Sequence, residues 1–309
     1  MKIKDRCEES ARNIPLNMPE AKYPENFIRF LGTAGTRFMM LSQRRSTGGI
    51  WFSYGASRGV IDPGPGSLVR ICEAVPCLSP IGINALILTH RHIDHSSDVN
   101  VLAEGMTLNS AEKRGDVLMT EDCSEPGDSV LLGFAEKKIK RVHRHEDGKK
   151  TELPGGVTVE SVQHRHHGVQ CFGLVFRKEG LPTWGLVSDT SALPDFPSRY
   201  GDCEILVMNV TMLLPRARLD HLSLPDAASL LGVIHPKLAL VTHMGGMLLD
   251  FGPGNIEKLL SSDRTKTVAA SDGLVVDLER PLAKIKACKL PGGRRALSNG
   301  ISASRRSGI

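Results

Sequence analysis

The chain has 309 residues, of which 40% are hydrophobic and 24% are charged, an ordinary composition for a soluble globular protein. Its first residues lack the apolar core of a signal peptide, and no apolar run reaches membrane-spanning length. The seven cysteines are scattered and form no CxxC pair, which predicts reduced thiols. We therefore expect a cytoplasmic protein with no membrane association.

The net charge of +5 is unevenly distributed. Residues 280–309 carry eight basic side chains and no acidic ones, whereas residues 1–279 carry 31 basic and 34 acidic side chains. We expect a polar lead-in over residues 1–25, one domain over residues 26–279 and a flexible basic tail over residues 280–309. The tail could contact nucleic acid, but a solvated chain end is the simpler interpretation.

The first predicted strand, residues 27–31, leads into a glycine loop whose spacing matches no nucleotide-binding fingerprint. Further strands are predicted at residues 48–52 and 59–61. The second of these ends at Asp62, in the sequence DPGPG. Proline and glycine alone would explain a tight turn there, but the Asp62 carboxylate could also orient a metal-ligating histidine.

The most informative motif follows a short apolar run at residues 85–88, which predicts a buried strand. Four potential metal ligands arrive within six residues of sequence: His90, His92, Asp94 and His95. Alternate residues of a strand point to the same side, so a continued strand would bring the first two histidines together. Imidazole and carboxylate are ligands that zinc prefers. The pattern HxHxDH therefore predicts a metal site.

Two later segments are also rich in histidine. Residues 139–156 contain His143 and His145 within a lysine-rich run that follows no apolar strand, which predicts a solvated hairpin. The predicted strand at residues 157–162 leads instead into His164, His166 and His167. Spacing alone does not choose among these three as a ligand.

Further polar residues follow predicted strands in the C-terminal half. An apolar run at residues 184–187 leads to Asp189, and the run at residues 238–241 ends in Thr242 and His243. Between them, the segment Asp220-His221-Leu222-Ser223 precedes a predicted helix. Ser223 could serve only as a helix cap there, whereas His221 is a candidate catalytic residue.

These motifs resemble those of the metallo-β-lactamase superfamily, in particular its ribonuclease Z-like and cyclic-phosphate phosphodiesterase branch. HxHxDH begins the two-metal centre of that superfamily, FLGT at residues 30–33 resembles its opening strand, and HGVQCFG at residues 167–173 fits its HxVxxxG frame. The resemblance implies a four-layered αββα sandwich, a layered α/β fold, over roughly residues 27–278.

The resemblance also implies a site with two divalent metal ions. His90, His92 and His167 would bind one ion, Asp94, His95 and His243 the other, and Asp189 would bridge them. Either His164 or His166 stays open as a replacement for His167. His221 and Asp94 are assigned catalytic roles, and Asp62, Thr89 and Thr242 are assigned supporting roles around the ligands.

Such a site would generate a hydroxide that bridges the two ions. Histidine at position 92 favours zinc, with manganese or iron as substitutes, whereas oxygen-reducing di-iron relatives carry glutamate there. His221 would stabilise the phosphate oxygens or protonate the leaving oxygen. We therefore expect a metal-dependent phosphodiesterase.

The substrate is expected to be a small or cyclic phosphodiester rather than tRNA. Only 21 residues separate His167 from Asp189, too few for the tRNA-gripping arm of bacterial ribonuclease Z, and the body of the chain is acidic. The alternatives are a ribonuclease Z-like RNA 3′ processing endonuclease, a non-catalytic metal-binding regulatory protein and a glyoxalase-type thioesterase. A homodimer is one assembly that the sequence leaves open.

Overall fold

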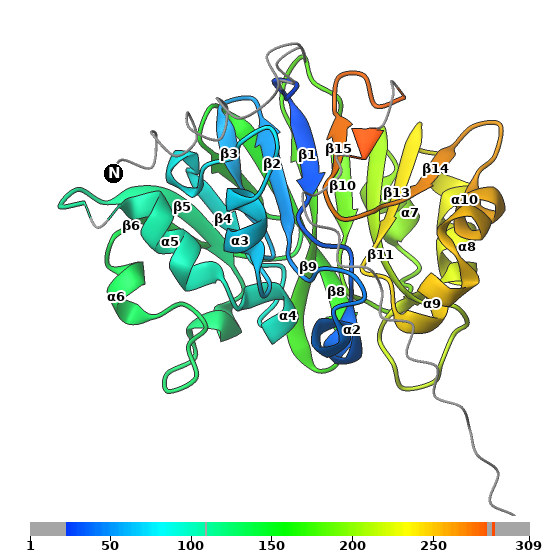
Figure 1. The fold of residues 1–309 in the computed structure, drawn as a ribbon, viewed down its shortest axis with the longest axis horizontal. Helices are drawn as coiled ribbons and strands as arrows, with labels where there is room; N and C mark the ends of the chain where they lie inside the picture. The colour runs from blue at the N-terminus through cyan, green and yellow to red at the C-terminus, as the bar shows by residue number, and fades with distance from the viewer. Residues whose placement is uncertain (1–22, 109, 283–285, 288–309) are drawn as a thin grey trace, which may run out of the picture.

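The structure is a computed structural model that describes residues 23–108, 110–282 and 286–287. Its strands form two sheets that face each other (Figure 1). The strands of the first sheet, in spatial order, are β16 (Lys286–Ala287), β15 (Leu274–Asp277), β1 (Phe27–Phe30), β2 (Ile50–Tyr54), β3 (Ser57–Ile61), β4 (Ala85–Ile87), β5 (Arg114–Met119) and β6 (Ile139–Arg144).

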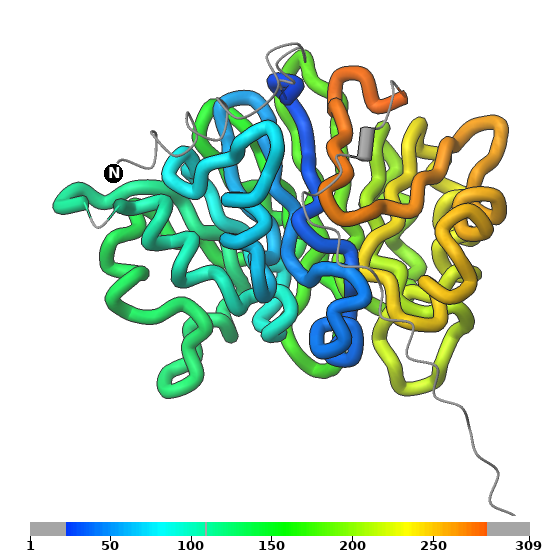
Figure 2. Tube along the Cα trace, viewed as in Figure 1, coloured from blue at the N-terminus to red at the C-terminus, as the bar shows by residue number. Residues whose placement is uncertain are grey.

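The second sheet is built almost entirely from the C-terminal half of the chain. At the end of the domain the chain returns to the first sheet, where β15 pairs antiparallel with β1. Figure 2 shows this orange segment beside the blue one. The strands of the second sheet, in spatial order, are β14 (Lys266–Ala269), β13 (Leu238–Thr242), β11 (Ile205–Met212), β10 (Trp184–Val187), β9 (Val169–Arg177), β8 (Val157–His166) and β7 (Lys150–Leu153), with the short β12 (Leu222–Ser223) paired to β11.

Helices cover the outer face of each sheet, so the domain has the four layers αββα that the resemblance implied. On the first sheet lie α3 (Ser67–Cys72), α5 (Val99–Thr107) and α6 (Gly133–Glu136). On the second lie α7 (Phe196–Tyr200), α8 (Leu224–Ile234), α9 (Gly246–Phe251) and α10 (Pro253–Leu260). The remaining short elements are α2 (Thr36–Ser42), α4 (Ile93–Ser96), η1 (Pro80–Gly82) and η2 (Glu121–Ser124).

Strand β4 and the first part of β11 are apolar without interruption, as expected where both faces of a strand are buried. In β4 and the residue after it, Ala85 and Ile87 face the core between the sheets, whereas Leu86 and Leu88 pack toward the outer helices. Strand β11 alternates in the same way. Burial on both faces therefore explains why these segments read as short continuous apolar runs.

The polar residues predicted at strand ends meet at one edge of the sandwich. Strands β3 to β6 of the first sheet run parallel, as do β10, β11, β13 and β14 of the second. Ser188, after β10, donates a hydrogen bond of 2.8 Å to the hydroxyl of Thr89, after β4. This contact joins the two sheets where their parallel strands end, which is where layered α/β folds place their chemistry.

The predicted solvated hairpin at residues 139–156 is wrong. Strand β6 pairs with β5 in the first sheet, whereas β7 pairs with β8 in the second, so the chain crosses between the sheets here. His145 lies at the crossing and is 5% exposed. Its two ring nitrogens contact the Ser161 hydroxyl at 2.7 Å and the Leu88 carbonyl oxygen at 3.0 Å. Both nitrogens are thus engaged, and His145 fastens the two sheets together.

The expected chain ends fall mostly outside the described residues. These exclude residues 1–22 and 288–309, which hold most of the expected lead-in and tail. Within the described part of the chain, no helix combines the length and apolarity that a membrane span requires.

Replacing Trp184 by alanine should lower the free energy of unfolding by about 3–5 kcal/mol, the usual cost of truncating a large core aromatic residue. Trp184 is fully buried between the sheets and stacks on Phe176 with ring centroids 4.1 Å apart. The change should appear as a lower urea midpoint. The matched control is Phe38→Ala, because that ring is 84% exposed and its loss should matter by less than about 0.5 kcal/mol. Equal midpoints for the two variants would contradict the assigned core.

Candidate metal centre

The HxHxDH motif folds into a loop and one helical turn after strand β4. His92 precedes α4, which carries Asp94 and His95. The His90 Nε2 atom lies 3.1 Å from His92 Nδ1. Two imidazole nitrogens thus meet although the regular strand ends before them, at Ile87.

The third histidine of this group is His166, not His167. Its Nε2 atom lies 3.1 Å from His92 Nδ1, and a single metal ion could contact His90, His92 and His166 together. Strand β8 extends to His166, and alternation along it buries His164 and His166 while exposing Arg165. His167 is not part of this group, contrary to the expected ligand set, and its donor atom lies instead with those of His166 and His221.

The turn between β8 and β9 explains why His167 lies outside the group. His167 and Gly168 form a two-residue connection in which both have positive φ, 44° and 75°, the backbone that tight hairpins need. This turn leaves the His167 side chain exposed. The other alternative, His164, is buried with its Nε2 atom 2.9 Å from the Tyr200 hydroxyl.

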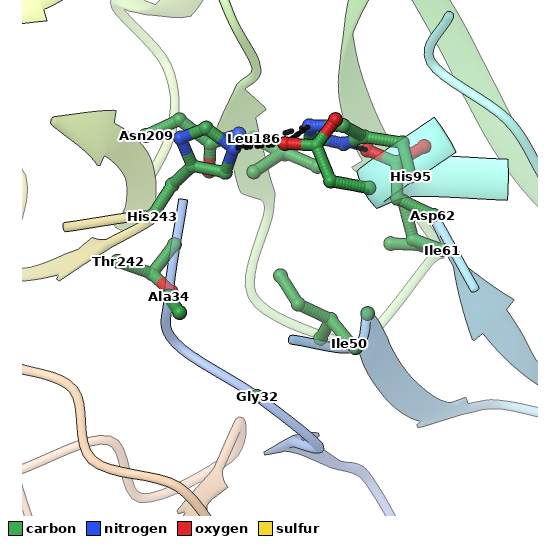
Figure 3. A pocket seen from close by; sticks show the side chains of 13 residues that line it. Gly32, Ala34, Ile50, Ile61, Asp62, His95, Leu186, Asn209, Thr242 and His243 are labelled. Carbon is green, nitrogen blue, oxygen red and sulfur yellow. Dashed lines mark hydrogen bonds and ion pairs between the residues drawn. The ribbon is translucent and has the colours of Figure 1, made fainter. Parts of the chain in front are cut away.

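A second group of donors comes from α4 and from the end of β13. His95 Nε2 lies 3.1 Å from His243 Nε2, and Figure 3 shows the two rings pointing toward each other across the pocket. The Asp94 Oδ2 atom is 3.7 Å from His95 Nε2 and 3.6 Å from His243 Nε2. Gly35 packs directly against His243, since a Cβ atom there would lie 2.2 Å from Nδ1. The glycine loop thus gives this histidine room.

The Asp189 carboxylate lies between the two groups. Its Oδ2 atom is 3.6 Å from His166 Nε2 and 3.4 Å from His95 Nε2, so one oxygen faces both. Its Oδ1 atom is 3.4 Å from His243 Nδ1 and accepts a 2.8 Å hydrogen bond from Asn209 Nδ2. Asp189 therefore lies close to donors from both groups.

The Asp62 carboxylate contacts the second group through His95. Its Oδ2 atom lies 3.0 Å from His95 Nδ1, leaving His95 Nε2 to face the site. The same carboxylate accepts hydrogen bonds of 2.7 Å from both the amide and the hydroxyl of Thr89. Thr242 is buried at the end of β13 and lines the pocket of Figure 3. Its supporting role around the ligands stays a prediction.

The charges around the site favour a bound cation. Burial lowers the pKa of His92 and His166 to about 4 and that of His90 well below its usual value, which leaves lone pairs free for a metal at neutral pH. Burial also disfavours charge on His95, yet three surrounding carboxylates raise its pKa well above the usual value. These carboxylates belong to Asp94, Asp189 and Asp62.

The donor spacing fits metal coordination. Tetrahedral zinc with bonds of about 2.0–2.1 Å to nitrogen places its ligand atoms about 3.3 Å apart. Five donor pairs within the two groups are 3.1 to 3.7 Å apart, and all donor atoms of each group lie within 4.8 Å of one another. The described residues thus offer two adjacent sets of donors for divalent metal ions, with Asp189 shared between them.

His221 lies beside the donors. Its ring centroid is 4.8 Å from that of His166, and its Nδ1 atom is 3.7 Å from Asp189 Oδ2. Burial lowers the pKa of His221 to about 4. Ser223 does cap α8, through a capping box with Asp226. The segment therefore caps α8 and also places His221 beside the donors, and the catalytic role of His221 stays a prediction.

Two residues of the site, Asn209 and Thr211, were not predicted from the sequence. Both lie on β11, two residues apart and so on the same side of the strand. Thr211 Oγ1 lies 2.9 Å from His243 Nδ1 and 3.2 Å from His221 Nδ1. A signal was present in the sequence, because these are the two polar residues in the otherwise apolar run ILVMNVTM.

Comparison with known proteins shows which family the chain belongs to. Residues 58–244 match the family model described as the β-lactamase superfamily domain. The chain is 30% identical over 224 residues to "Uncharacterized protein MJ1374" of Methanocaldococcus jannaschii, an alignment that covers 71% of this chain and 82% of that protein.

Solved structures share the fold at low sequence identity. The metallo-β-lactamase fold protein YhfI from Bacillus subtilis has a TM-score of 0.67 at 17% identity, over 81% of this chain and 98% of that one. The short form of human tRNase Z has a TM-score of 0.57 at 15% identity, over 82% and 99% of the two chains. The matched family model, the two-sheet sandwich and the order of the histidine and aspartate motifs agree, and the chain belongs to the metallo-β-lactamase superfamily.

Proposed function

We propose that this protein is a metal-dependent phosphodiesterase with a dinuclear site. His90, His92 and His166 would hold one ion, and Asp94, His95 and His243 the other. The observation that carries the proposal is the position of Asp189, whose Oδ2 atom lies within 3.6 Å of a histidine from each group. A shared carboxylate is what a metal pair needs and what a single structural zinc site does not.

Two divalent cations, zinc by the donor chemistry with manganese or iron as substitutes, would acidify a water molecule and offset charge on the substrate. The protein's own residues do the rest. Asp62 holds His95 so that Nε2 faces the site, and Asn209 holds the bridging carboxylate. These buried hydrogen bonds fix the donors before substrate arrives, which is the main source of electrostatic catalysis.

The position of His221 favours a phosphodiester over a thioester or a lactam. Its ring lies beside His166 and near Asp189 at the edge of the donor set. A hydrogen-bond donor there could stabilise negative charge on a phosphate oxygen or on the leaving oxygen. A purely regulatory metal site would have no chemical need for this histidine.

A small or cyclic diester is the substrate class that we favour. Strands β9 and β10 are joined only by residues 178–183, which leave no room for a tRNA-gripping arm. The acidic body likewise offers no excess of positive charge for a long polyanion. The fold shared with human tRNase Z keeps RNA processing as the outcome to test against.

The zinc-loaded protein should hydrolyse bis(p-nitrophenyl) phosphate, and removal of the metal by a chelator should abolish this activity. A substrate screen would add cyclic nucleotides, tRNA precursors and thioesters. Cleavage of cyclic nucleotides would support the substrate class. Rapid cleavage of thioesters with no cleavage of diesters would refute the proposed function, and cleavage of tRNA precursors alone would move it to RNA processing.

Exchange of His166 for alanine should remove about half of the bound metal and lower kcat by at least about 100-fold, because one ion would lose a ligand that faces the bridging carboxylate. The matched control is His167→Ala, one position along the chain, which should keep its full metal content because the side chain is exposed. Metal analysis of both purified variants gives the answer. Full metal in the first variant with loss in the second would restore the original assignment.

Removing the His221 ring in His221→Ala should lower kcat for diester cleavage by about 100- to 1,000-fold, as expected for the loss of a transition-state hydrogen-bond donor. Metal content should stay at the wild-type level, because the six histidine and aspartate ligands and Asp189 remain. Steady-state kinetics and metal analysis on the same preparation separate the two effects. Unchanged cleavage would show that His221 has no catalytic role.

A further inference from the structure

Thr211 is the one described hydroxyl group that contacts both a proposed metal ligand and the proposed catalytic histidine. Its Oγ1 atom lies 2.9 Å from His243 Nδ1 and 3.2 Å from His221 Nδ1. The side chain is 6% exposed, so water does not readily substitute for either contact. A hydroxyl group has a single hydrogen to donate and two lone pairs to accept with. The direction of each hydrogen bond therefore depends on the hydrogens of the two rings.

His243 sets the direction of the first hydrogen bond. Its Nε2 atom faces His95 Nε2 and Asp94 Oδ2 across the donor group. In a neutral imidazole with the Nε2 lone pair directed at a metal, the hydrogen resides on Nδ1. His243 Nδ1 then donates to Thr211 Oγ1, and the threonine hydrogen is free to point elsewhere.

The second hydrogen bond then runs from Thr211 to His221. Within the described residues, the other polar neighbour of Thr211 Oγ1 is His221 Nδ1, whereas the Asp189 carboxylate is farther from that nitrogen, at 3.7 Å. A ring that accepts at Nδ1 and is neutral carries its hydrogen on Nε2. The order His243, Thr211, His221 thus forms a hydrogen-bonded chain with one direction.

We propose, building on the phosphodiesterase function above, that Thr211 is a positioning residue that fixes the tautomer of His221. The Nε2–H group of His221 would then face the substrate and donate a hydrogen bond to a phosphate oxygen. No bond to hydrogen breaks in this role, since Thr211 and His221 both keep their hydrogens. His221 therefore acts by stabilising charge rather than by transferring a proton, which distinguishes between the two roles considered for it.

The tautomer is tested directly by nitrogen NMR of protein labelled with 15N-histidine, with His221→Ala used to assign the signals. Wild type and Thr211→Ser should show His221 protonated on Nε2 in the zinc-loaded protein, where the metal would fix the tautomer of His243. Thr211→Val keeps the shape of the side chain but removes the hydroxyl, so the Nδ1–H form should appear. Protonation of His221 on Nδ1 in the wild type would overturn the proposal.

Kinetics on bis(p-nitrophenyl) phosphate separate the two histidines. Thr211→Val should lower kcat about tenfold or more with little change in KM, and Thr211→Ser should restore it to within about threefold. In the His221→Ala background, Thr211→Val should cost nothing further, because its effect passes through the missing ring. An equal loss in both backgrounds, or failure of serine to rescue, would mean that Thr211 acts through His243 and would overturn the proposal.

The two experiments test the phosphodiesterase function and the tautomer of His221 separately. A wild-type protein that cleaves no diester would refute the proposed function, whereas the His221 spectrum would still decide its tautomer. Metal analysis of each variant, run beside the kinetics, identifies any loss of activity that comes from a loss of metal at His243.

Discussion

The site depends on one charge balance, that between buried carboxylates and the imidazoles that surround them. Asp189 and Asp94 are held ionised among histidines, because His95 and His243 lower the pKa of both carboxyl groups despite their burial. Buried negative charge is costly unless positive charge compensates it. Divalent cations held by the two donor groups would supply this compensation, and the surrounding fold keeps those donors in place.

The two sheets are joined by hydrogen bonds at the edge that carries the site, and these bonds keep the donors in place. Thr89 links Asp62 to Ser188, and so connects a carboxylate of the first sheet with the end of β10 in the second. His145 makes a second connection, between the Leu88 carbonyl oxygen and the Ser161 hydroxyl. A site whose donors come from both sheets keeps its geometry only if the sheets do not slide, and these buried hydrogen bonds oppose sliding.

Strand β11 has a particular part in this arrangement. It is apolar except at Asn209 and Thr211, and these two residues point toward the site from the same side of the strand. One hydrogen-bonds the bridging carboxylate, and the other contacts both His243 and His221. The positions of a carboxylate, a proposed metal ligand and a proposed catalytic histidine are therefore set by a single rigid element, which favours precision over movement.

The sequence motifs, through their resemblance to the metallo-β-lactamase superfamily, predicted the layered fold and marked most of the residues of the proposed donor set. Apolar strands that end in histidine or aspartate are a local pattern. The parallel strands β10 and β13 of the second sheet bring Asp189 and His243 to one edge, whereas His90 follows β4 of the first sheet. Only the tertiary structure decided between His166 and His167, because that choice depends on where β8 stops and on the positive-φ turn after it.

The same holds for His145 and for Thr211. The lysine-rich run around His145 indicates exposure to solvent. The chain nevertheless crosses there from the first sheet to the second, which buries the histidine. The contacts of Thr211 join residues 10 and 32 positions away. Local sequence fixes which residues a strand presents and on which side, but which of them meet depends on long-range packing, and no short-range pattern encodes that.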